Sequence, residues 1–193
     1  MGYKHQAEDI INTGMELIRT KGYHNVGINE ILKASNIPKG SFYNFFESKE
    51  DFARKALDSY GNSSLEMIKS FLRNKELSPV ERLKSFYGYL IDANEQEGFI
   101  AGCLINTISM EVGGLSSVLA GSADQNFNVW LDEIAICIEE GQDKGEIRTD
   151  YLPKELAEYM HVGTYGAFSR MKMTKNRLYL DNWFEMTFNF IET

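Results

Sequence analysis

Polar side chains that could contact a nucleic acid gather in one short stretch near the start of the chain. Its members are Lys39, Gly40, Ser41, Tyr43 and Asn44. The amine of Lys39 and the phenol of Tyr43 can reach phosphates, and the carboxamide of Asn44 can read a base edge or a phosphate. Gly40 lets the backbone approach another surface closely. These groups suit the major groove of DNA.

Lys49 is a further candidate for a phosphate contact. It lies in Ser48-Lys49-Glu50-Asp51, a capping-box pattern that starts a helix. A helix start offers free backbone N–H groups to an anion, and Lys49 beside them would complete a phosphate clamp. The alternative is a capped helix with a solvated lysine.

Three helices are predicted to position these groups. The first, which ends near Gly22, has one apolar face made of Ala7, Ile10, Ile11, Gly14, Met15 and Ile18. The second starts near Gly27, and Pro38 both ends it and opens the third. The third spans residues 39–46 and places three aromatic side chains opposite its polar ones: Phe42, Phe45 and Phe46. The alternative is a small helical bundle whose polar face is incidental.

At these residues the sequence resembles the TetR family of transcriptional regulators. The likeness covers residues 5–60 and rests on Gly-Ile-Asn-Glu-Ile-Leu, Ile-Pro-Lys-Gly-Ser-Phe-Tyr-Asn-Phe-Phe and Glu-Ser-Lys-Glu-Asp-Phe. It implies an all-α protein of about nine helices, with a helix-turn-helix DNA-binding domain over residues 1–50. Residues 51–193 would then bind an effector and form the dimer.

The resemblance also implies roles for individual residues. The dimer would bind a palindromic double-stranded DNA operator, with Lys39 to Asn44 on the recognition helix and Lys49 against the DNA backbone. Two positions depart from the family. Gly27 stands where many members have a Ser or Thr that touches phosphate, and Asn44 stands where histidine is frequent. Operator preference is therefore expected to differ.

Composition indicates a helical protein, and although a net charge of −8 argues at first against nucleic acid, the distribution of charge along the chain softens that objection. Apolar residues make up 43% of the chain and there are three prolines. No apolar run is long enough for a membrane span and the first residues lack a signal peptide, so a cytoplasmic location is expected. Residues 1–60 hold eight basic and eight acidic residues, so the net charge of −8 lies entirely in residues 61–193.

Cys103 is a candidate sensor of electrophiles or oxidants. Gly102-Cys103-Leu104 begins a predicted helix and resembles the TetR subgroup of the N-ethylmaleimide reductase repressor and the acrylate-responsive repressor. A thiol in the first turn of a helix has a stabilised thiolate. The resemblance makes Lys172 its possible partner. The alternative is an inert buried thiol, which is the better reading of Cys137.

The rest of the chain is predicted to hold a pocket and a dimer interface. Aromatic and methionine side chains that either line the pocket or form core are Phe86, Tyr87, Phe99, Met110, Phe127 and Trp130. The last two helices carry more apolar residues than one face needs, which indicates a homodimer interface containing Tyr159, Gly163, Ala167, Trp183, Phe184 and Phe188. A purely intramolecular core is the alternative.

These patterns favour a dimeric repressor released from its operator by a small-molecule effector or by modification of Cys103. An enzyme is not expected, because no nucleophile–base pair, metal cluster or phosphate loop is present. No cofactor or metal is expected. A helical interaction module without DNA binding remains the alternative.

Overall fold

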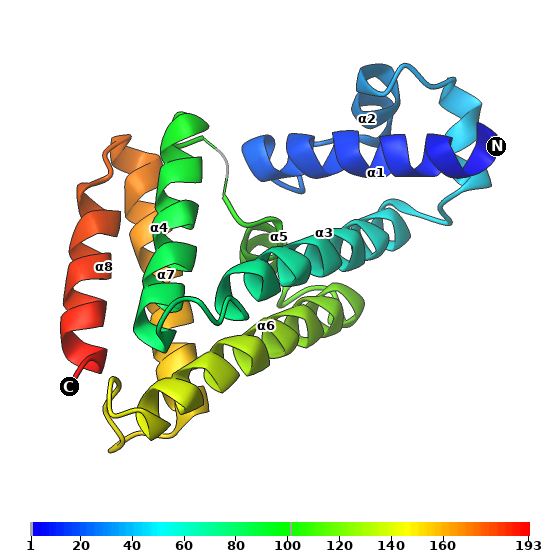
Figure 1. Cartoon of the computed structure of the whole chain (residues 1–193). Helices are drawn as coiled ribbons and strands as arrows, with labels where there is room; N and C mark the ends of the chain where they lie inside the picture. The colour runs from blue at the N-terminus through cyan, green and yellow to red at the C-terminus, as the bar shows by residue number, and fades with distance from the viewer. Residues whose placement is uncertain (1, 101) are drawn as a thin grey trace. The chain divides into compact units, whose positions relative to one another are not determined.

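The computed structural model describes residues 2–100 and 102–193, without the side chains of residues 2–6 and Lys39. Over these residues the chain forms eight α-helices and one 3-10 helix, with one isolated β-bridge between Ile147 and Glu192 (Figure 1). The helices are α1 (Gly2–Lys21), α2 (Ile28–Ala34), η1 (Lys39–Asn44), α3 (Lys49–Leu72), α4 (Pro79–Gln96), α5 (Leu104–Val112), α6 (Ser117–Asp143), α7 (Pro153–Thr174) and α8 (Leu178–Ile191). The all-α prediction is confirmed.

Capping residues explain where several helices begin and end. Ser78 and Glu81 form a reciprocal capping box at the start of α4, with Pro79 in its first turn. Gly22 has a φ of +91° and ends α1, because glycine enters this left-handed region without steric cost. Asn36, at φ +55°, turns the chain between α2 and η1.

The predicted third helix is shorter and tighter than expected. We expected a helix over residues 39–46, whereas a 3-10 helix spans Lys39–Asn44. Its characteristic bonds run between residues three apart, as from Ser41 N–H to the Pro38 carbonyl at 2.9 Å. Pro38 lacks an N–H and the segment is only two turns long, so the tighter form is sufficient.

The chain divides into two compact units. The N-terminal unit contains residues up to Ser63 together with the stretch that ends at Asn126, and therefore includes α1, α2, η1 and α5. The C-terminal unit contains Ser64–Ile100 and Phe127–Thr193, and therefore includes α4, α7 and α8. The functional boundary at residue 50 stays a prediction.

Each unit has its own apolar core. In the N-terminal unit, α1 approaches α3 so closely that a Cβ on Gly14 would lie 2.3 Å from Phe52 Cζ. In the C-terminal unit, α7 and α8 run antiparallel side by side (Figure 1) over a cluster of Ile91, Ala167, Phe168, Met171 and Leu180. Within the described residues, no helix has the length and apolar character needed to cross a membrane.

Candidate nucleic-acid interface

The predicted recognition residues lie on the outer side of η1. Tyr43 is 68% exposed, and Asn44 and Gly40 are exposed as well. A Cβ on Gly40 would meet no described atom within 4 Å, so packing within the chain does not require glycine there. Ser41 is half-buried, and the side chain of Lys39 lies outside the described part of the structure.

An aromatic cluster beneath η1 holds this polar face in place. Phe42, Phe46 and Phe52 are buried, and the ring centroids of Phe42 and Phe46 are 5.0 Å apart. The Phe46 and Phe52 rings meet edge to face at 5.2 Å, a favoured arrangement for aromatic pairs. Because the apolar side of η1 is anchored, Tyr43 and Asn44 must point away from the core.

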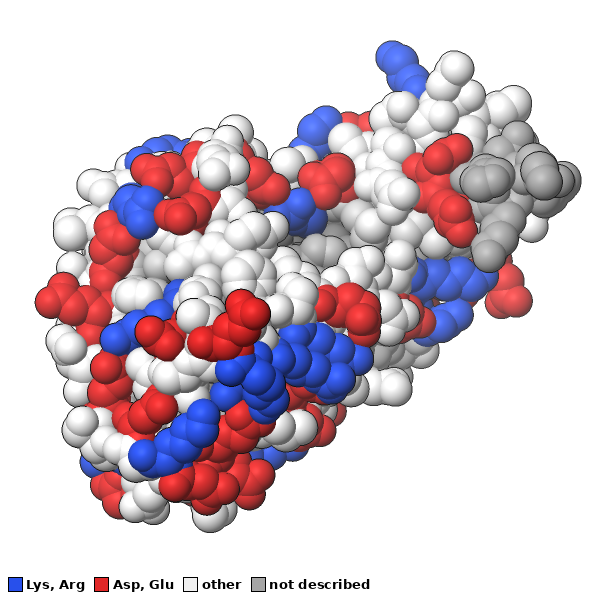
Figure 2. Space-filling model, viewed as in Figure 1, with Lys and Arg blue, Asp and Glu red and all other residues white. Residues whose placement is uncertain are grey.

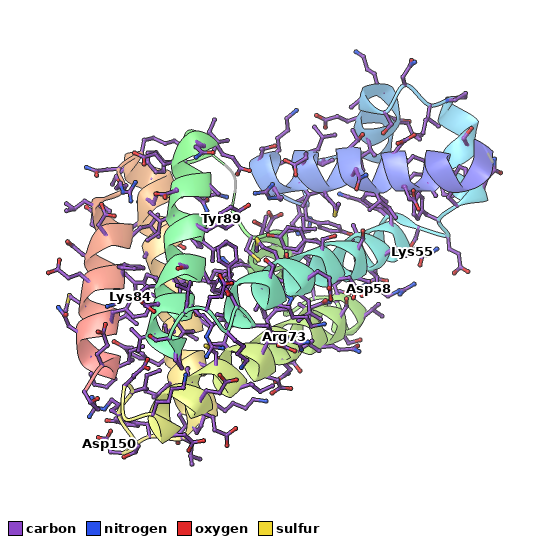
Figure 3. The ribbon with its side chains drawn as sticks, in the orientation of Figure 1. Lys55, Asp58, Arg73, Lys84, Tyr89 and Asp150 are labelled. Carbon is purple, nitrogen blue, oxygen red and sulfur yellow. The ribbon has the colours of Figure 1, made fainter. Side chains whose placement is uncertain are left out.

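The start of α3 reinforces the end of η1. Lys55, which projects from α3 in Figure 3, donates to the Phe45 carbonyl at 3.1 Å and to Asp51 at 2.8 Å. The Asp51 N–H donates to the Ser48 hydroxyl at 3.0 Å, which caps α3 as its sequence predicts.

Lys49 is already engaged within the chain. Its Nζ donates to the Tyr23 carbonyl at 2.6 Å and lies 4.2 Å from the centroid of the Tyr23 ring. Burial lowers the pKa of Lys49, and the nearby Glu111 carboxylate opposes this shift. The reading of Lys49 as a solvated lysine is therefore wrong, while its predicted phosphate contact would have to use the other N–H donors of the ammonium.

Glu111 belongs to this site, and sequence reasoning missed it. Its carboxylate accepts hydrogen bonds from the N–H groups of Tyr23 and His24, 88 and 87 positions away in the sequence. No local pattern marks a side chain whose partners are backbone groups so distant along the chain.

Cys103 is the N-cap residue of α5, and its half-buried side chain is not part of a disulfide bond. The side chains of Tyr60 and Cys103 are hydrogen-bonded to each other; burial first and Cys103 second raise the pKa of Tyr60. The Arg19 Nε donates to the Gly102 carbonyl at 2.8 Å and brings a positive charge to the same place. A tyrosine hydroxyl, a guanidinium and a helix N-terminus therefore lie beside the Cys103 side chain.

The second cysteine has a different environment. Cys137 is buried in the C-terminal unit, and burial raises its pKa to about 11. Its Sγ donates to the Pro79 carbonyl at 3.5 Å. Lys172, the predicted partner of Cys103, lies half-buried on α7 in the C-terminal unit, whereas Cys103 lies in the N-terminal unit, so their pairing stays a prediction.

The predicted pocket residues have mixed surroundings. Phe86, Tyr87 and Trp130 are buried, and Phe99 and Phe127 are half-buried, all within the C-terminal unit. Met110 belongs to the N-terminal unit and is 80% exposed on α5, so its place in a pocket stays a prediction. Among the described residues, the buried Tyr87 hydroxyl, Trp183 Nε1 and His161 Nε2 find no hydrogen-bond partner.

Several predicted dimer-interface residues are covered by their own chain. Ala167 and Phe188 are buried, and a Cβ on Gly163 would lie 2.4 Å from Trp183 Nε1. For these positions the intramolecular alternative holds, because α8 packs directly on α7 and α4. Tyr159 remains 47% exposed and Phe184 half-buried. Other large apolar side chains exposed on α7 and α8 are Val162, Met173, Leu178, Met186 and Phe190.

Basic and acidic side chains are interspersed on the visible face of the protein (Figure 2). In the N-terminal unit, Arg54 bridges Asp51 and Asp58, and Lys21 pairs with Glu30 at 2.6 Å. Because many cations are already paired, DNA contact would depend on a few well-placed groups rather than on overall charge.

Two family models match the chain. The model described as "Bacterial regulatory proteins, tetR family" matches residues 10–56, and the one described as "Tetracyclin repressor-like, C-terminal domain" matches residues 79–186.

Curated relatives and solved structures agree with these models. The transcriptional repressor DhaR of Mycobacterium sp. is 33% identical over 94% of this chain and 89% of its own length. The regulator AcuR of Cereibacter sphaeroides is 32% identical over 86% of this chain and 76% of its own length, and the repressor NemR of Escherichia coli is 26% identical over 96% and 94%. A crystal structure of a Rhodobacter sphaeroides TetR protein superposes with a TM-score of 0.91 at 29% identity, covering 95% of this chain and 97% of its own. Reduced E. coli NemR gives a TM-score of 0.87 at 25% identity, covering 97% of this chain and 98% of its own.

Proposed function

Because the chain belongs to the TetR family of bacterial transcriptional regulators, we propose that it is a repressor that binds a palindromic operator as a homodimer. We further propose that an electrophile acting at Cys103, or a ligand in the C-terminal unit, releases it. DNA-binding regulation itself follows from family membership, which sets aside the enzyme and the interaction module without DNA binding. The proposed place of action is the cytoplasm.

The exposed face of η1 is the observation that best supports the proposed DNA contacts. Tyr43 and Asn44 project from a segment whose opposite side is buried, and the exposed Gly40 leaves the backbone accessible. In this arrangement Tyr43 would position the protein by a phosphate contact, while Asn44 would read a base edge. In a dimer, two such segments about 34 Å apart would enter successive major grooves.

Fluorescence anisotropy with DNA from upstream of the regulator's own gene tests these assignments. Tyr43→Ala is expected to weaken binding to all sequences by roughly fivefold to tenfold, because one phosphate contact is lost. Asn44→Ala is expected to relax preference at one base pair. The control is Tyr89→Ala at an exposed tyrosine of the C-terminal unit, labelled in Figure 3. Unchanged operator affinity in both η1 variants would remove the assignment.

The exposed apolar side chains of α7 and α8 support the homodimer. Val162 is 58% exposed and Met186 is 71% exposed, although both are large and apolar. Burying such a surface against a second copy would remove it from water. Val162→Glu is expected to shift sedimentation from dimer to monomer and to reduce operator affinity. An unchanged dimer would place the interface elsewhere.

The surroundings of Cys103 support a thiol trigger. A thiolate helped by Tyr60, Arg19 and the α5 N-terminus would add to an electron-poor alkene, which takes its proton from solvent. N-ethylmaleimide is expected to weaken operator binding of the unmodified protein at least tenfold. Cys103→Ser should resist, whereas Cys137→Ser should respond normally.

Equal release of the Cys103→Ser variant would reject the thiol trigger and favour a reversible ligand. The unpartnered Tyr87 hydroxyl and Trp183 Nε1 support that second trigger, because buried donors without acceptors are costly and a ligand oxygen would satisfy them.

A further inference from the structure

Two charged side chains hold the segment between α1 and α2 by its backbone, one through N–H groups and the other through a carbonyl. Glu111 Oε1 accepts from Tyr23 N–H at 3.0 Å, and Oε2 accepts from His24 N–H at 2.8 Å. On the other side, Lys49 Nζ donates to the Tyr23 carbonyl at 2.6 Å. The carboxylate and the ammonium thus grip the same short backbone segment, which we call the clasp (Tyr23, His24, Lys49 and Glu111).

The backbone before the clasp is shaped to admit the carboxylate. Gly22 has a φ of +91°, and a Cβ at this position would lie 2.5 Å from Glu111 Oε1. A side chain would therefore be strained by its backbone conformation and would collide with the carboxylate. The close approach of Glu111 depends on glycine at position 22.

The clasp lies at the base of the helix-turn-helix. His24 lies four residues before the first residue of α2, and Lys49 is the first residue of α3, so α2 and η1 form a loop between the two. The hydrogen bond from Lys49 to the Tyr23 carbonyl closes that loop. The hydrogen bond from the Tyr23 N–H to Glu111 then connects the point of closure to α5. Charge-assisted hydrogen bonds of this kind are about twice as strong as neutral ones.

We propose that Glu111 is a positioning residue for operator binding, which couples the position of α5 to the helix-turn-helix. Glu111 stands seven residues after the start of α5, and Cys103 caps that start, so one short rigid helix joins them. A rise of 1.5 Å per residue places the two about 12 Å apart. A displacement at Cys103 would reach the clasp without crossing from one unit to the other. This inference rests on the proposed function and names its regulatory link.

Three variants test the clasp: Glu111→Gln, Glu111→Ala and the control Glu139→Gln at an exposed glutamate of α6. Gln retains one acceptor oxygen and Ala retains none, so operator affinity is expected to fall ~10-fold in the first and ~30-fold in the second. The control should bind normally. Thermal unfolding and dimer mass are measured in parallel, so that a general loss of structure is recognised.

Two further readouts separate positioning from stability. Hydrogen exchange of the Tyr23 and His24 amides is expected to speed up in both Glu111 variants, while amides in the middle of α1 stay protected. N-ethylmaleimide should lower the operator affinity of Glu111→Ala by a smaller factor than that of the unmodified protein, because the variant already lacks the hydrogen bonds between α5 and the Tyr23–His24 backbone.

Wild-type operator affinity and wild-type amide exchange in Glu111→Ala would overturn the proposal. The proposal would also be overturned if Glu111→Ala lowered the melting temperature and regained wild-type operator affinity on cooling, because the loss of binding would then come from partial unfolding. If N-ethylmaleimide fails to release the unmodified protein, the thiol trigger fails, and the affinity order and amide exchange still decide the clasp. If the unmodified protein binds no operator, the repressor proposal and the role of Glu111 in operator binding both fail, and amide exchange decides only whether Glu111 holds the segment before α2.

Discussion

His161 is expected to make the stability of the protein depend on pH. Its ring lies on α7 among aromatic side chains, with centroids 4.8 Å from Phe127 and 4.7 Å from Tyr165. Burial lowers the pKa of His161 from its ordinary 6.5 to about 4. Protonation is therefore easier in the unfolded chain than in the folded one.

The sign of the effect follows from that difference. The contribution of His161 to stability is fully present above pH 6.5 and is lost as the pH falls from 6.5 towards 4, where the unfolded chain binds the extra proton. At about 1.4 kcal/mol per pH unit, the interval corresponds to an upper limit of about 3 kcal/mol. Partial exposure of the ring to water reduces this figure.

His161→Phe removes the titrating group and keeps a ring in place. Urea unfolding followed by tryptophan fluorescence, at fixed protein concentration and at several pH values from 7 to 4.5, measures the free energy of unfolding. The unmodified protein should lose up to about 3 kcal/mol more than His161→Phe over this range. Phe188→Leu, which removes packing against Tyr87 but no titrating group, should retain the full pH dependence. Parallel curves for the unmodified protein and His161→Phe would refute the reasoning.

Three other perturbations have outcomes that the structure predicts. Glu140→Ala leaves the buried guanidinium of Arg82 without its 2.6 Å carboxylate partner and should lower the free energy of unfolding in urea by about 3 kcal/mol. Arg82→Met, which buries no charge, should lower it by less, and the opposite order would contradict this reasoning. Gly22→Ala should weaken operator binding and cost about 1 kcal/mol or more. Gly121→Ala, at an exposed position of α6 where a Cβ meets no described atom within 4 Å, should cost nothing, and equal effects of the two changes would count against the clasp geometry. Cys137, whose pKa is raised to about 11 by burial, should react with iodoacetamide far more slowly in the native protein than in urea; fast native labelling detected by mass spectrometry would show that its burial is misjudged.

Local sequence signals were sufficient for several helix boundaries. Gly22 predicts the end of α1, Pro38 the start of η1, and Ser48 the start of α3, as observed. These signals work because capping and proline effects act within four residues of the chain. The sequence also predicts that the polar residues of η1 lie opposite the nearby phenylalanines, because large apolar side chains among polar neighbours favour the buried side of a helix. Phe42 and Phe46 are buried, as this predicts.

The tertiary structure decided every contact between distant parts of the chain. It attached Glu111 to Tyr23, directed Lys49 onto a carbonyl, and brought Tyr60 and Arg19 to the surroundings of Cys103. It also buried Phe188 and Ala167 inside their own unit, where the count of apolar residues had indicated a partner. Periodicity shows that a helix has an apolar face, but only the packing of other helices determines what covers that face. The same holds for a charged side chain, whose type and spacing give its chemistry while the fold supplies its partner.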